Sequence, residues 1–343
     1  RANSMTSVIV SSPYVNPSNT LRRLMINVII GLIPGTLAYV WFFGPGILVN
    51  ISIAVLFALG YEALILWIRK KPIKPHLNDY SAVVAAWLFA LCLPTHSPWW
   101  LVVVGIGFAM IAGKHLYGGL GFNPFNPAMV GYVVLLISFP KEMTTWHLPV
   151  SISGEAYGLV DSLKFAFGVG DSSWDAFTAA TPLDYVKTAL RQDVPLSEIY
   201  QAPLFGKLGG IGWEWISAGW LVGGIWLLIN QTIRWHNPAA FLGSLGCIAL
   251  VFYFIDAETA TSPLFHWLSG GAMLGAFFIA TDPVSAATTN NGRIYYGILI
   301  GLLVYLIRNW GGYPDGVAFA VLLANMCVPL IDYYTQPKVY GAK

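Results

Sequence analysis

The stretch ILVNISIAVLFALGYEALILWI, residues 47–68, decides the fold class of this chain. Its only charged residue is Glu62, and Arg69, Lys70 and Lys71 follow it directly. A helix needs about 20 mostly apolar residues to cross the hydrocarbon core of a bilayer. The stretch therefore predicts a membrane-spanning helix that ends at a basic cluster.

Composition extends this prediction to the whole chain. Of 343 residues, 56% are hydrophobic and 10% are charged, whereas roughly 25% are charged in a soluble domain. The chain is therefore predicted to be an all-α polytopic membrane protein with about ten spans. The candidate spans lie near 24–43, 47–68, 78–94, 98–113 and 122–140, and then near 211–230, 238–255, 264–281, 294–308 and 314–332.

The two groups of five spans carry similar breaks. Leu93-Pro94 and Asp282-Pro283 each end the third span of a group, and Gly118-Gly119 corresponds to Gly311-Gly312. Because each group has an odd number of helices, the second group must enter the bilayer from the opposite face. We expect two inverted five-helix repeats, with a binding site between them near the midplane.

Basic residues predict the orientation, because cytoplasmic connections are enriched in Lys and Arg. The basic connections fall on one side of the membrane, with Arg308 as the exception, so both termini are placed in the cytoplasm. No cleavable signal peptide is expected. The predicted organisation is a cytoplasmic segment 1–23, a first repeat 24–140, a periplasmic loop region 141–210, a second repeat 211–332 and a cytoplasmic tail 333–343.

Several functional classes find no support in the residues. A net charge of +2, with no basic cluster that suggests nucleic-acid binding, argues against a nucleic-acid partner. The scattered cysteines and histidines give no disulfide framework and no metal site. No glycine-rich loop for a nicotinamide and no iron–sulfur motif is present. If electrons pass through this protein, other subunits must supply them.

Two polar motifs lie at predicted helix ends, and each has two interpretations. The run Asn123-Pro-Phe-Asn126-Pro is either a capped helix start or a set of amides that contact a flavin ring or phosphate. Asp282 is either solvated at the membrane surface or part of an ion pathway. Glu62 is expected to snorkel or to pair with Arg69, and Lys114 and Arg308 are expected to anchor helix ends at the interface.

The run Asp175-Ala-Phe-Thr178-Ala-Ala-Thr181-Pro-Leu183 lies in the long polar region between the two groups of spans. Taken alone, it is an alanine-rich loop that runs into a turn. It also resembles the flavinylation signature of bacterial respiratory subunits, in which the last threonine carries flavin mononucleotide (FMN) through a phosphoester bond. On that resemblance Thr181 is the attachment residue, Thr178 is the fallback and Asp175 helps to position the loop.

Taken together, the motifs resemble the family of the D subunit of the Rnf electron-transport complex and, more distantly, the B subunit of the sodium-pumping NADH:quinone reductase. The matching motifs cover essentially the whole chain and include Phe122–Pro127, Asp175–Leu183, Ala280–Pro283 and Arg308–Phe319. One departure is visible, because Thr178-Ala-Ala-Thr181 stands where Ser-Gly-Ala-Thr is common.

The resemblance implies a subunit of an ion-translocating oxidoreductase in the bacterial inner membrane, catalytically incomplete alone. It would relay electrons between NADH and ferredoxin through covalent FMN, coupled to Na⁺ or H⁺ movement; a second, noncovalent riboflavin stays open. Implied partners are the other Rnf membrane and peripheral subunits, including a second flavin-carrying subunit and iron–sulfur subunits, together with a flavin transferase and membrane lipid. The alternatives are a small-solute channel of urea-transporter-like fold and a scaffold without a cofactor.

Overall fold

The structure is a computed structural model that describes residues 21–154, 157–169, 178–313 and 315–337, and these are mostly helical. Within these residues, four helices are long and apolar enough to cross a membrane, so the chain is a multi-pass membrane protein. They are α1 (Leu21–Phe43), α2 (Gly46–Ile68), α13 (His236–Ile255) and α17 (Val317–Thr335).

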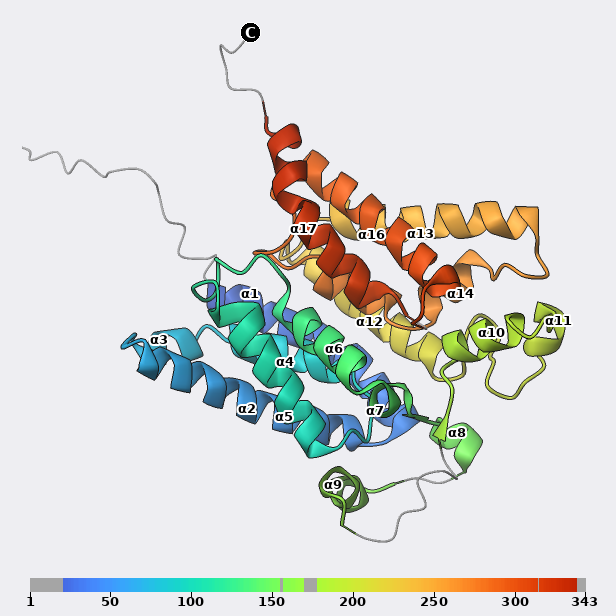
Figure 1. The fold of residues 1–343 in the computed structure, drawn as a ribbon, viewed down its shortest axis with the longest axis horizontal. Helices are drawn as coiled ribbons and strands as arrows, with labels where there is room; N and C mark the ends of the chain where they lie inside the picture. The colour runs from blue at the N-terminus through green and yellow to red at the C-terminus, as the bar shows by residue number, and fades with distance from the viewer. Residues whose placement is uncertain (1–20, 155–156, 170–177, 314, 338–343) are drawn as a thin grey trace, which may run out of the picture.

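Shorter apolar helices, together with the 21-residue helix α16, complete two bundles. In the first bundle, α4 (Ser81–Leu91), α5 (Trp99–Phe108) with its π-helical continuation η1 (Ala109–His115), and α6 (Pro127–Ser138) join α1 and α2. A short helix, α3 (Ile73–Leu77), follows α2. In the second bundle, α12 (Trp213–Ile229) and α16 (Asn290–Trp310) accompany α13 and α17. Figure 1 shows the first bundle in blue to green beside the second in yellow to red.

The predicted span 264–281 is not one continuous helix. It consists of α14 (Pro263–Leu268), a break at residues 269–271, α15 (Ala272–Leu274) and the π-helix η3 (Gly275–Ile279). Gly270 has φ +67, a left-handed conformation that favours glycine. The prediction of an uninterrupted span here was wrong, because Gly270 turns the chain and the backbone N–H of Gly271 bonds to Asp315 outside the helix.

Helix packing follows a similar pattern in both bundles. In the first, α2 packs on α4 and α5; in the second, α13 packs on α14 and α16. The bundles meet where α1 crosses α12 and where α6 contacts α17. At the α1–α12 crossing, a Cβ on Gly223 would overlap the carbonyl oxygen of Gly31, and one on Gly35 would overlap the Trp220 ring. Small residues therefore bring the two backbones together.

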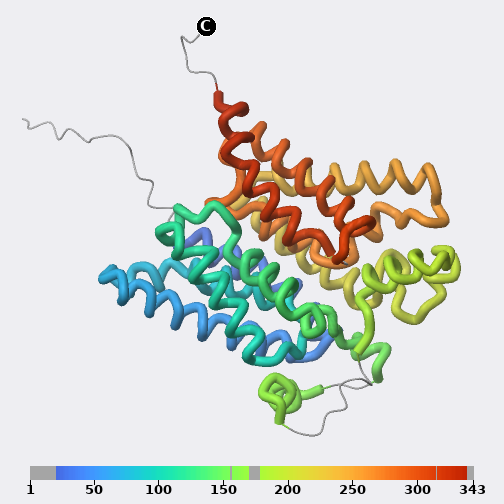
Figure 2. The backbone as a smooth tube through the Cα atoms, viewed as in Figure 1, coloured from blue at the N-terminus to red at the C-terminus, as the bar shows by residue number. Residues whose placement is uncertain are grey.

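A connecting region of short elements lies at one end of both bundles, and Figure 2 traces it from α9 to α11. The antiparallel strands β1 and β2 pair Trp146 with Ala179 and His147 with Thr178. Helices α10 and α11 share a small apolar core with Phe265 of α14, which fixes them to the second bundle. The elements are α7 (Pro140–Thr144), β1 (Trp146–His147), α8 (Val150–Ser153), α9 (Leu159–Phe167), β2 (Thr178–Ala179), α10 (Pro182–Leu190) and α11 (Leu196–Ile199).

Candidate functional site

Thr181 is the N-cap residue of α10. Its backbone is extended, and its Oγ1 accepts a hydrogen bond from the backbone N–H of Asp184 at 3.3 Å. Pro182 occupies the first turn, where its fixed φ suits a helix start. A threonine cap followed by proline explains why the helix begins here. The hydroxyl therefore sits at the positive end of the helix dipole.

The residues before Thr181 come from strand β2. Thr178 is half-buried and pairs with His147 in the two-stranded sheet. The sheet brings the chain back to α10 in a defined register. Asp175 lies outside the described residues.

Two cations on α10 attach this helix to the C-terminal end of α16. Lys187 Nζ donates to the carbonyl oxygens of Tyr313 at 2.7 Å and Ile307 at 3.3 Å. Arg191 Nη2 donates to the carbonyl oxygen of Gly311 at 3.3 Å. Cations at a helix C-terminus are favoured by the helix dipole and by the free carbonyl groups. The position of Thr181 is thus fixed through α10.

Burial also shifts the pKa values of two groups on α10. Burial raises the pKa of Asp184, against the lowering influence of Lys187 and Arg191. Burial, with help from the Arg191 charge, lowers the pKa of Lys187. The start of α10 is therefore a partly desolvated, electrostatically coupled surface.

A large cavity opens beside Thr181 between the two bundles. It holds about 1010 Å³ of empty space, counting the solvent at its opening. Helices α1, α4, α6, α12 and α17 line it, together with α15 and η3. Its walls are mostly apolar and aromatic, and they include Tyr39, Tyr132 and Trp213. The Tyr39 hydroxyl is buried and has no hydrogen-bond partner among the described residues.

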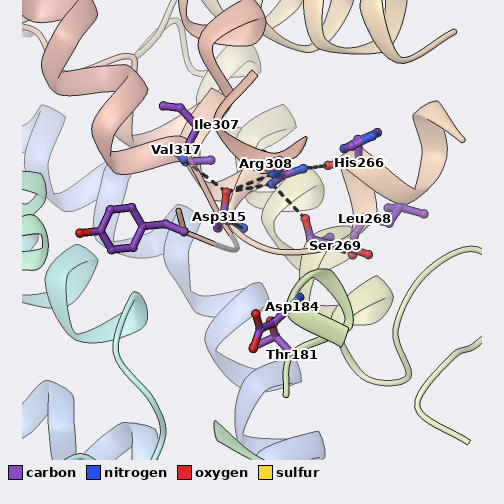
Figure 3. Close-up of polar contacts among 12 residues, drawn as sticks. Thr181, Asp184, His266, Leu268, Ser269, Ile307, Arg308, Asp315 and Val317 are labelled. Carbon is purple, nitrogen blue, oxygen red and sulfur yellow. Dashed lines mark hydrogen bonds and ion pairs between the residues drawn. The ribbon is translucent and has the colours of Figure 1, made fainter. Parts of the chain in front are cut away.

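A buried ion pair closes the side of the cavity next to α10. Arg308 is 3% exposed, and its Nε donates to Asp315 Oδ1 at 3.1 Å. The same guanidinium donates to the carbonyl oxygens of His266 and Ser269. Asp315 Oδ2 accepts from the Gly271 N–H at 2.7 Å. The pair thus ties the break after α14 to the turn after α16, as Figure 3 shows above Thr181 and Asp184.

The two predicted asparagines lie at the N-terminal end of α6 and in the turn before it. Asn126 is the N-cap of α6 and accepts from the Met129 N–H at 3.3 Å, while its Nδ2 donates to the Ile279 carbonyl oxygen. Asn237 of α13 donates to the carbonyl oxygen of Ala280, the residue that follows η3. Asn123 Nδ2 donates to the Phe125 carbonyl oxygen. Neither predicted asparagine is among the described residues lining the cavity, and their contact with a flavin stays a prediction.

Asp282 stabilises a local turn. Its Oδ2 accepts hydrogen bonds from the Ser285 hydroxyl at 2.6 Å and the Ser285 N–H at 3.2 Å. The Asp282 carboxylate therefore has hydrogen-bond partners within its own turn. A role in ion movement stays a prediction.

The expected pairing of Glu62 with Arg69 and the expected place of Lys114 at the interface were both wrong. Lys114 is 2% exposed, and its Nζ contacts Glu62 Oε1 at 2.6 Å and Ser81 Oγ at 2.8 Å. Arg69 donates instead to the His115 carbonyl oxygen at 2.7 Å. The π-helical geometry of η1 adds a residue to the turn. From this π-helical turn, the Lys114 side chain points into the first bundle. The sequence pattern does not display such a turn.

The sequence matches the family model described as the NQR2, RnfD, RnfE family over residues 8–341. The chain belongs to this family. The resemblance inferred from the motifs is therefore confirmed, and the match includes the described residues around Thr181.

Three relatives of similar length share about half of their residues with this family member. Each is named as the D subunit of an ion-translocating oxidoreductase complex. The relative from Aliivibrio salmonicida is 51% identical over 99% of both chains. The one from Vibrio cholerae is 51% identical over 98% of this chain and 100% of its own. The one from Salmonella enteritidis is 50% identical over 97% and 98%.

Sequence reasoning missed part of the candidate site in this family member. It treated Arg308 as an interface anchor, whereas the structure buries it against Asp315. The signal was available, because Arg308 and Asp315 stand in one motif and Arg308 was the exception to the charge asymmetry. The roles of Tyr39 and Lys187 had no comparable local signal, since their partners lie far away in the sequence.

Proposed function

We propose that this protein is the membrane subunit of an ion-translocating oxidoreductase complex and that Thr181 carries FMN through a phosphoester bond. The observation that carries the proposal is that Thr181 lines the cavity between the bundles. The names of the relatives support the class of complex. In the full proposal, electrons pass between NADH and ferredoxin, coupled to Na⁺ or H⁺ translocation.

The start of α10 suits a phosphate ester. A phosphate on Thr181 Oγ1 would lie at a helix N-terminus, where backbone N–H groups and the dipole favour negative charge. Lys187 and Arg191 add positive charge on the same helix. Formation of the ester replaces only the hydroxyl hydrogen, so the oxygen that caps α10 stays in place.

The cavity suits an aromatic ring system. Its apolar walls exclude water, and the unpartnered Tyr39 hydroxyl supplies a hydrogen-bond donor inside it. Bound flavin supplies the ability to accept and release electrons, which the protein tunes through hydrogen bonds and local charge. Tyr39 would orient the ring, while Trp213 and Tyr132 would pack beside it. The same cavity is the place to search for a second, noncovalent riboflavin.

The proposed architecture is two inverted five-helix repeats. The similar packing of α2 and α13 within their bundles supports it. So does the placement of Lys114 at the end of η1 and Arg308 in the last turn of α16, since both are buried cations. With both termini cytoplasmic, α10 and Thr181 would face the periplasm of a cell with an inner membrane, where a flavin transferase could reach them.

Other subunits complete the proposed activity. The sequence has no nicotinamide loop and no iron–sulfur motif, so electrons must enter and leave through partners. We therefore expect no complete NADH–ferredoxin reaction from this chain alone. The partners would be the remaining Rnf subunits, including those with iron–sulfur clusters and a second flavin.

The test is covalent flavin on the isolated polypeptide. Full-length protein produced together with a flavin transferase should fluoresce like flavin after denaturing electrophoresis, and peptide mass spectrometry should locate FMN at residue 181. Thr181→Ala should abolish the signal, whereas Thr178→Ala, the matched control, should retain it. A dark wild-type band from cells that flavinylate other targets would overturn the proposal and favour a small-solute channel or a cofactor-free scaffold.

A further inference from the structure

A second cavity lies on the other side of the Arg308–Asp315 pair. It holds about 570 Å³ of empty space, counting its opening, and α10, α14 and α16 line it. Leu183 lines both cavities, but Thr181 is not among the described residues that line this one. The second cavity therefore forms a site of its own, beside the proposed flavin site.

The lining of this cavity is cationic. Lys187, Arg191 and Arg308 all contribute to it, and no acidic side chain is among the described residues that line it. Two carboxylates interact with these cations: Asp315 pairs with Arg308, and Asp184 interacts with Lys187 and Arg191. Three cations thus face two carboxylates that both line the other cavity. The field within the second cavity favours an anion.

A buried histidine adds an unpartnered polar atom. His266 is 2% exposed and lines the cavity, and its Nε2 lies 2.8 Å from the Thr261 hydroxyl oxygen. Its Nδ1 has no hydrogen-bond partner among the described residues. If the Thr261 hydroxyl donates to Nε2, Nδ1 carries the ring hydrogen and is a free donor. Such a donor suits a phosphate oxygen.

Exposed apolar side chains lie on the helices that line this cationic cavity or pack against those helices. Leu264 lies beside the lining residues of α14, and Trp310 follows the lining residues of α16; they are 43% and 60% exposed. Phe254 and Ile255, at the end of α13, are 79% and 73% exposed. The α13 helix packs against both α14 and α16. A ligand with a phosphate and long apolar chains matches this combination of charge and exposed apolar surface.

We propose that the cavity binds the phosphate of an anionic glycerophospholipid, whose acyl chains lie along the exposed apolar side chains of α13 and α16. Basic pockets between membrane helices bind anionic headgroups by this chemistry. The bound headgroup would bridge α10 to α14 and α16. The lipid would therefore stabilise the helix that carries Thr181 without contacting the flavin site.

The test measures lipid binding by the full-length, delipidated protein in detergent. Dioleoyl phosphatidylglycerol should raise the thermal unfolding temperature and remain bound in native mass spectra, whereas dioleoyl phosphatidylcholine should do neither. Arg191→Gln and Lys187→Gln should each weaken phosphatidylglycerol binding about fivefold, as expected for one interfacial cation. Lys207→Gln, an exposed lysine outside this cavity, is the matched control and should bind like wild type.

Three outcomes would overturn the proposal. Equal binding of the anionic and zwitterionic lipids would exclude headgroup recognition. The same stabilisation by inorganic phosphate alone would identify a free-anion site instead of a lipid site. Unchanged binding in Arg191→Gln, whose exposed side chain makes it the variant less disruptive to folding, would move the lipid elsewhere. Repeating the titration with Thr181→Ala separates this result from the flavin proposal, because lipid binding should persist there.

Discussion

At the scale of single residues, the most consequential feature is the charge buried inside the first bundle. Glu62 and Lys114 are 1% and 2% exposed, and Ser81 provides a further hydrogen bond to the ammonium group. Removal of one partner from such a pair leaves an uncompensated charge in a medium of low dielectric constant. The pair therefore matters more for the cost of breaking it than for the energy it supplies.

We predict that Lys114→Met lowers the free energy of unfolding by about 3–5 kcal/mol, because Glu62 stays buried without its cation. The measurement is reversible unfolding in mixed micelles. The double variant Glu62→Gln/Lys114→Met should recover part of the loss, since no buried charge then remains. Lys71→Met, at an exposed lysine, is the matched control. Equal free energies of unfolding for Lys114→Met and Lys71→Met would contradict the prediction.

Two histidines predict a response to acid in the connecting region. The ring of His96, in the turn before α5, lies 4.4 Å from the ring of His147 in β1. Burial and the neighbouring His147 lower the pKa of His96 to about 3, and burial lowers the pKa of His147 to about 4. Both values lie below the ordinary 6.5, so the unfolded state binds more protons between these limits. Stability should therefore fall as the pH drops below about 6.5.

This prediction is tested by amide hydrogen exchange in α9, whose Ser162 hydroxyl lies 3.5 Å from His96 Nε2. Exchange, corrected for its intrinsic pH dependence, should accelerate from pH 7 to pH 4.5. His96→Asn should reduce the pH dependence. His76→Asn, at a histidine of α3 outside this cluster, should leave it unchanged. A pH-independent corrected rate in wild type would refute the proposed origin in these rings.

At the scale of elements, the α1–α12 crossing is the contact that joins the bundles through glycines. Gly31 and Gly35 face Gly219 and Gly223 so closely that added methyl groups would meet backbone or ring atoms. In a bilayer, such close packing replaces the hydrophobic driving force that operates in water. The shape of the cavity depends on this crossing, because α1 and α12 both line it.

We predict that Gly223→Ala lowers the free energy of unfolding by about 1–3 kcal/mol, the usual cost of overpacking. Gly243→Ala is the matched control, because it also lies in an apolar helix and nothing is within 4 Å of its added Cβ. The control should be neutral or slightly stabilising, owing to the better helix propensity of alanine. The measurement compares the thermal unfolding temperatures of the two variants in the same detergent. Similar unfolding temperatures would show that the crossing tolerates separation.

The sequence predicted the apolar helices well and their interruptions less well. Runs such as 47–68 are visible because membrane helices need continuous apolar length. The break at Gly270 was missed because a single glycine is common inside membrane helices, and only the hydrogen bond to Asp315 distinguishes this one. Thr181 was proposed from a local motif. A binding site between the two groups of helices was expected, but the residues that line the cavity could not be predicted, because they come from elements far apart in the sequence.

At the scale of the whole molecule, α10 and the basic turn after α2 lie at opposite ends of the first bundle. In Figure 1, α3 marks one end of that bundle and α7 marks the other. The proposed orientation places the first end in the cytoplasm. Thr181 would then face the periplasm together with the mouth of the cavity.

We predict opposite accessibility for cysteines introduced at Lys71 and Lys207, two exposed positions, in a variant that lacks the native Cys92, Cys247 and Cys327. In intact spheroplasts, a membrane-impermeant maleimide should label Lys207→Cys and leave Lys71→Cys unlabelled until the membrane is lysed. The asymmetry of basic residues is the physical reason. Labelling of both positions before lysis, or the reverse pattern, would contradict the orientation.

The capping hydroxyl of Thr181 also bears on the order of maturation. Since α10 is anchored to α16 at its far end and begins with an oxygen that already caps the helix, the helix would not need the proposed ester in order to form. A modifying enzyme would therefore act on a finished fold rather than on a nascent chain. Biogenesis could then halt at a stable, unloaded intermediate, and cofactor supply would determine how much of the inserted protein becomes redox-active.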